Sequence, residues 1–117
     1  MDEFKLDPGA DADGTFYRAK VMVPPKRLVD RFGRPGRGDG YKVSGCYVFT
    51  DQAGNVFTLY DFKATSLSDD GAGYGEESSA PTPKEFWGNW NPDLLHIGAR
   101  DQGDVEAFKR WLLVQVG

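Results

Sequence analysis

A chain of 117 residues that is 39% hydrophobic and 14% aromatic is long enough for one domain with its own core, and too aromatic for a disordered protein. Its single cysteine excludes an internal disulfide framework, so we expect a reducing, cytoplasmic location. No apolar run approaches the roughly 20 residues that span a bilayer, and the acidic start lacks the basic residues of a secretory signal. We therefore expect no membrane partner.

The net charge of -4 conceals a segregation of charge along the chain. Residues 1–13 hold five acidic residues and one lysine, with Phe4 and Leu6 as apolar anchors. This composition predicts an acidic flexible arm before a single domain over 14–117. Residues 18–42 hold eight basic residues and two acidic ones, which predicts a basic surface on an acidic protein.

The first elements of the predicted domain are a strand and a short helix. Aromatic and β-branched residues predict a strand over 15–23, and two prolines end it. Proline suits the first turn of a helix, and the apolar spacing that follows predicts a helix over 25–32 with Gly33 as its cap. The glycine-rich basic stretch 33–40 predicts a loop.

The next stretch predicts a β-hairpin, which is the strongest structural pattern in the chain. Its arms are residues 41–50 and 56–63, and Gly54-Asn55 supplies the backbone freedom that a tight turn requires. Strict alternation places Tyr47 and Phe49 on one face of the first arm.

The remainder predicts a long loop over 64–82, one helical turn over 83–90, a short strand over 94–98 and a C-terminal helix with Asp101 as its N-cap. The order is strand, helix, strand, strand, strand, helix. It favours an α+β fold with an antiparallel sheet of about four strands and two helices on one face.

The basic segment 26–42 is the first candidate site. Arg27 and Arg31 share a helix face that leads into a loop carrying Arg34 and Arg37, an arrangement that suits phosphates or an acidic protein surface. The other interpretation is that these arginines solvate the helix and pair with nearby acids.

The open end of the hairpin is the second candidate. Lys42 and Asp61 are predicted to be near cross-strand neighbours. A binding site could form where His96 meets the basic loop 33–40 and the loop 64–82, whose residues 69–77 hold four acidic residues and no basic one. The candidate binding residues of the whole chain are Arg27, Arg31, Arg34, Arg37, Tyr41, Lys42, Tyr60, Asp61, Lys63 and His96.

Catalysis and metal binding have little support. Cys46, His96 and Asp61 could form a nucleophile, a base and an orienting acid, but Cys46 lies mid-strand with no helix N-terminus to lower its pKa. One histidine and one cysteine exclude a zinc site, and residues 11–14 lack the final glutamate of a calcium loop. We expect no enzyme activity, no metal and no cofactor.

Four segments resemble a group of small uncharacterised proteins of bacteriophages and large DNA viruses: Leu28 to Pro35, Asp39 to Val43, Gly54 to Lys63 and His96 to Gly98. The resemblance implies expression inside an infected cell. It also implies an accessory role, either blocking a host factor or sequestering a small signal molecule, and it carries no established activity.

The sequence therefore favours a small non-enzymatic binding protein with a protein partner, such as a viral accessory protein that binds a host factor. The alternative is a nucleotide or single-stranded nucleic-acid binder that contacts phosphates through the basic segment and stacks bases on aromatic residues. A third interpretation is a homodimer, formed edge to edge by Val56 to Leu59 of the hairpin.

Overall fold

The computed structural model of the chain describes residues 4–37, 43–62, 82–101 and 103–116, and the side chain of Arg37 is not described. Predictions about Tyr41, Lys42, Lys63 and the loop 64–82 lie outside these residues. None of the described helices is long and apolar enough to cross a membrane. In chain order the elements are β1 (Phe4–Leu6), β2 (Phe16–Val23), α1 (Pro25–Phe32), β3 (Gly36–Arg37), β4 (Gly45–Asp51), β5 (Val56–Tyr60), α2 (Pro83–Trp87), β6 (Asp93–Ala99) and α3 (Val105–Val116).

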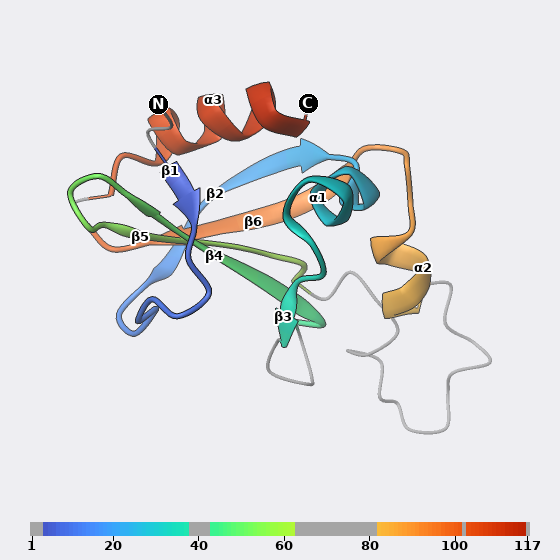
Figure 1. The fold of residues 1–117 in the computed structure, drawn as a ribbon, viewed down its shortest axis with the longest axis horizontal. Coiled ribbons are helices and arrows are strands. Elements are labelled where there is room, and N and C mark those ends of the chain that lie inside the picture. The colour runs from blue at the N-terminus through green and yellow to red at the C-terminus, as the bar shows by residue number, and fades with distance from the viewer. Residues whose placement is uncertain (1–3, 38–42, 63–81, 102, 117) are drawn as a thin grey trace.

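The fold is α+β, as predicted, and is built on one antiparallel sheet. Five strands follow the order β1-β4-β5-β6-β2, and the two-residue β3 pairs with β4 beside β1. The predicted order of elements is confirmed, with β1 and β3 added to it. Figure 1 shows α1 and α3 on the same side of the sheet, which also matches the prediction.

The predicted hairpin is confirmed as β4 and β5. Their register runs from Cys46 opposite Tyr60 to Thr50 opposite Val56, and Gly54 takes a φ of 87° in the turn. A residue that carries a side chain cannot adopt this backbone angle without strain, so glycine is required there. Because β5 lies between β4 and β6, its edges are already paired, and the predicted edge-to-edge dimer through Val56 to Leu59 is wrong.

Aromatic rings from the sheet and from α3 form the centre of the core. Phe57 and Phe108 stack with centroids 5.0 Å apart, and Phe49 lies 5.2 Å from Phe108. On the α1 side, Phe32 contacts Phe49 edge-on at 5.1 Å. Both helices therefore bury their apolar stripes against the same face of the sheet, where aromatic pairs add to the burial of apolar area.

Helix α1 has the predicted bounds, whereas α3 begins later than predicted. The N–H of Gly33 donates to the carbonyl of Val29 at 2.8 Å and caps α1. At the start of α3, the Asp104 carboxylate accepts from the N–H of Ala107 at 3.0 Å, as an N-cap residue does. The predicted N-cap at Asp101 is wrong, because a turn closed by a Gly103 to Arg100 backbone bond precedes the helix.

The predicted flexible arm is also wrong for residues 4–13, which are part of the domain. Phe4 is only 3% exposed and pairs with Asp51 in the sheet. The N–H of Asp7 donates to the carbonyl of Val48 at 2.7 Å, and Arg100 donates to the carbonyls of residues 11 and 13. The acidic composition of this segment predicts a flexible arm, whereas the buried ring of Phe4 anchors the segment in the sheet.

Replacing Phe4 by alanine should therefore lower the free energy of unfolding by about 3 kcal/mol or more, because its ring fills space between Phe57 and Phe108. Urea denaturation measures the change. Lys5→Ala, an exposed neighbour in the same strand, is the control and should change the free energy by less than about 0.5 kcal/mol. Equal effects of the two substitutions would contradict the docked position of β1.

Candidate functional site

The sheet has a second face, opposite the helices, which we call the open face. Strand register places Cys46, Tyr60, His96 and Lys20 in one row across β4, β5, β6 and β2. These residues alternate along their strands with buried core residues, so their side chains point away from the helices. Two residues of this row, Tyr60 and His96, are among the binding residues predicted from the sequence.

Three aromatic side chains gather on the open face around His96, which makes a group of four rings. Its ring lies 4.9 Å from that of Tyr17, 5.7 Å from Tyr60 and 5.3 Å from Phe62, with the Phe62 ring stacked at 24°. Tyr17 is 49% exposed and Phe62 is 40% exposed. We call these four residues the ring cluster; a large aromatic surface left to solvent on a sheet is a mark of a binding site.

A glycine of β6, Gly98, lies beside the ring cluster. Gly98 stands opposite both Thr58 and Tyr17 in the register. A Cβ atom on Gly98 would lie 2.5 Å from the Thr58 hydroxyl oxygen and 3.3 Å from the Phe16 carbonyl oxygen. Glycine is therefore required here by close packing against β5 and β2.

His96 and Tyr60 of the ring cluster are uncharged at neutral pH. Burial lowers the pKa of His96, and the nearby Lys20 ammonium lowers it further. Burial raises the pKa of Tyr60, and so do the neighbouring Cys46 and Tyr17. The imidazole is thus neutral and the phenol protonated, and Lys20 is the positive charge closest to the rings in its row.

Asp61 lies at the end of β5, fully buried, and it faces the helices. Its carboxylate accepts from the N–H of Ser44 at 2.9 Å, from the N–H of Gly45 at 2.9 Å and from the Ser44 hydroxyl at 2.6 Å. The Ser44 hydroxyl in turn accepts from the indole N–H of Trp87 at 3.0 Å. Burial raises the pKa of Asp61, and these hydrogen bonds oppose the rise. Its position is structural, contrary to its predicted place in a binding site.

The residues considered for catalysis are not brought together. Tyr60 stands between Cys46 and His96 in the row, two strand spacings or about 10 Å across. Burial raises the pKa of Cys46 to about 11, so its thiol is protonated and unreactive at neutral pH. Within the described part of the chain, no group of three His, Cys, Asp or Glu residues could hold a metal ion.

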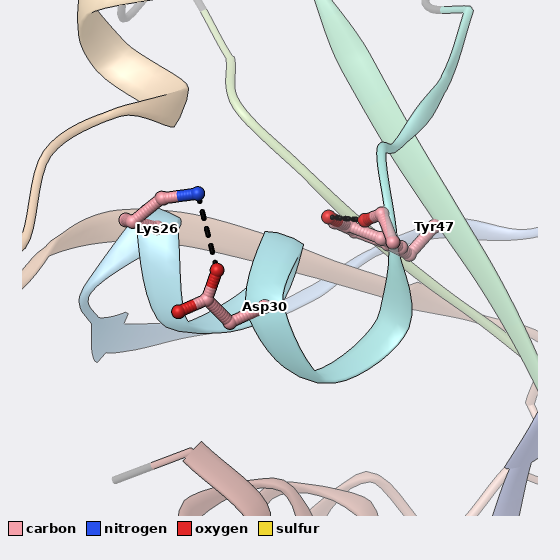
Figure 2. A network of polar contacts seen from close by, with 4 residues as sticks. Lys26, Asp30 and Tyr47 are labelled. Carbon is pink, nitrogen blue, oxygen red and sulfur yellow. Dashed lines mark hydrogen bonds and ion pairs between the residues drawn. The ribbon is translucent and has the colours of Figure 1, made fainter.

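The part of the predicted basic segment that the structure describes, residues 26–37, does not converge with His96. Helix α1 carries Arg27 and Arg31 over the other side of the sheet, and the Arg31 guanidinium donates to the side chain of Gln115 in α3 at 2.9 Å. On the same helix, Lys26 pairs with Asp30 at 3.1 Å (Figure 2). The interpretation that the basic residues solvate the helix and pair with nearby acids is thus supported for Lys26.

A hydrogen bond joins the end of α1 to the sheet, and a cavity lies beside it. The Tyr47 hydroxyl donates to the Gly33 carbonyl at 2.6 Å (Figure 2). Arg34 follows and lines a cavity of about 380 Å³ between β1 and β3, together with Leu6, Pro8 and Cys46. Arg34 is therefore a predicted base whose side chain lines a cavity.

Sequence reasoning missed Tyr17, Phe62 and Lys20. The strand that carries Tyr17 was predicted, but a register shift between Tyr17 and Ala19 breaks the alternation that would assign its face. Phe62 lies beyond the end of β5, where no periodicity applies. The Phe-rich ending of the hairpin was the available signal for it.

No protein-family model matches the chain, and no curated protein matches it significantly. The resemblance to small viral proteins stays a prediction, and so does a host factor as partner.

Replacing Asp61 by alanine should lower the free energy of unfolding by about 3 kcal/mol, because it leaves two backbone N–H groups without an acceptor. Asp61→Asn keeps an oxygen for those groups and should cost about 1 kcal/mol. Urea denaturation at pH 7 gives both values. Equal losses in the two variants would contradict the role of the carboxylate as a hydrogen-bond acceptor.

A comparison of the wild type with Asp61→Asn at several pH values reports the pKa of Asp61. A folded-state pKa raised above 3.8 means that the folded chain holds a proton that the unfolded chain has lost. The wild type should therefore lose stability relative to Asp61→Asn as the pH rises from about 4 through the raised pKa. A difference that runs the other way would show a lowered pKa.

Proposed function

We propose that the chain is a small non-enzymatic binding protein and that its open face binds single-stranded nucleic acid. The observation that carries this proposal is the ring cluster, in which Tyr17 and Phe62 are exposed on either side of His96. Bases splayed from a single strand stack on aromatic side chains of a sheet surface, at about 1–3 kcal/mol per base. Nucleic acid was the alternative from sequence, there assigned to the basic segment.

The geometry offers each base a separate ring. Tyr17 belongs to β2 and Phe62 follows β5, with the β6 residue His96 between them. Successive bases can therefore stack on Tyr17 and Phe62. Every base has a flat face, so the recognition expected is tolerant of sequence.

Charge contributes little to this binding. The chain is acidic overall, and the open face carries Lys20 and, opposite Thr50, Lys5. Two phosphate contacts on a single strand predict a slope of about -1.4 for log affinity against log salt. Four phosphate contacts through the basic segment would give about -3, so the salt slope separates the two surfaces.

Removing the exposed rings should weaken binding at least about tenfold, since each stacked base contributes about 1 kcal/mol or more. The measurement is fluorescence anisotropy with a labelled single strand of mixed sequence, about ten nucleotides long. Tyr17→Ala with Phe62→Ala is the test variant. Trp90→Ala is the matched control, because Trp90 is an exposed aromatic residue beside Lys26 of α1, away from the open face.

The same strand annealed to its complement should bind more weakly than the single strand, because paired bases cannot stack on the rings. No binding by the wild type, or an equal loss in Trp90→Ala, would overturn the proposal. A slope near -3 that is reduced by Arg27→Gln would return the site to the basic segment.

A protein partner, favoured by the sequence, is the second candidate. It is supported by a different feature, the outer edge of β2, which pairs with no strand that the structure describes, and the apolar groove beside it.

A further inference from the structure

Strand β2 forms one edge of the sheet. It is eight residues long and pairs with β6 along one side from Phe16 to Val23. No strand among the described residues pairs with its other side. The backbone N–H and C=O groups of that outer side form a row that an extended chain can continue.

A groove of about 310 Å³ runs along this edge, between β2 and α3. Its lining residues are Lys20, Val21, Met22, Leu94, Lys109 and Leu113. Met22 is 55% exposed, and Leu94 and Leu113 are also exposed. An apolar groove beside an open strand edge provides the two parts of strand addition, namely main-chain bonds for affinity and pockets for side chains.

Charge decides which occupant fits. Lys20 and Lys109 are the charged residues of the lining, and neither has an ion-pair partner in the described part of the chain. A second copy is disfavoured, because two antiparallel β2 strands would bring Arg18 and Lys20 of both copies into one short stretch. An acidic segment meets opposite charge at both lysines.

We propose that an extended acidic segment of a partner protein adds as a strand to the outer edge of β2. Its apolar side chains enter the groove between Met22 and Leu113, and its carboxylates face Lys20 and Lys109. This surface extends past the edge of β2 to Lys109 and Leu113 of α3, on the helical side of the sheet, and it shares Lys20 with the row that crosses the open face. A nucleic acid on the open face and a peptide on the β2 edge are thus different ligands, and Lys20 lies beside both.

The test uses a soluble synthetic peptide of about ten residues built on the repeat Glu-Glu-Val-Val, which presents both residue types on each face of an extended strand, and a matched peptide with lysine in place of glutamate. Titration is followed by amide correlation spectra of the isotope-labelled full chain. The glutamate peptide should shift the amides of β2 and the last two turns of α3, and should slow hydrogen exchange along β2. The lysine peptide should bind at least about fivefold more weakly, as expected for lost surface ion pairs.

Lys109→Glu should reduce the affinity for the glutamate peptide about fivefold at low salt. Arg27→Glu is the matched control, because it makes the same change of charge on α1, outside the groove. Phe62→Ala removes a ring that lies outside β2 and should leave peptide binding unchanged, which separates peptide binding from the stacking of bases on the ring cluster.

Several results would overturn the proposal. They are equal binding of the two peptides, equal losses in Lys109→Glu and Arg27→Glu, and shifts centred on any other element. Sedimentation that shows a dimer with β2 amides protected in the absence of peptide would assign the edge to a second copy instead.

Discussion

Asp61 is a carboxylate buried on the helical side of the sheet, and three hydrogen bonds from Ser44 and Gly45 hold it there. Through the Ser44 hydroxyl the same network reaches Trp87 of α2. Side chains alternate along a strand, so an Asp61 fixed toward the helices turns Tyr60, the last residue of β5, toward the open face. The ring cluster therefore depends on a polar residue that never touches it.

The one-sided placement of the helices is the second constraint. An antiparallel sheet covered on one face ordinarily presents polar side chains on the other. Here the other face presents an imidazole and three aromatic rings. Burial of this kind of surface stabilises a complex and not the free chain, which is why we assign it to a ligand.

Local patterns predicted the elements better than the contacts between them. Helix α1 and the turn at Gly54 follow from proline and glycine chemistry, which acts within a few residues. Strand β1 has only three residues, too few for periodicity, and Phe4 is buried by partners about fifty and a hundred positions away. The site was half predicted for the same reason: Tyr60 and His96 lie on regular strands, whereas a bulge hides the face of Tyr17.

Photocrosslinking tests the central claim, that the open face is the nucleic-acid surface, most directly. A single strand carrying a photoreactive base would be irradiated with the full chain, and the attached residues identified by mass spectrometry. The account predicts crosslinks at Tyr17, Phe62 and His96, competed by unlabelled single strand. Crosslinks confined to residues 26–34 of α1 and the segment that follows, or an absence of competed crosslinks, would contradict it.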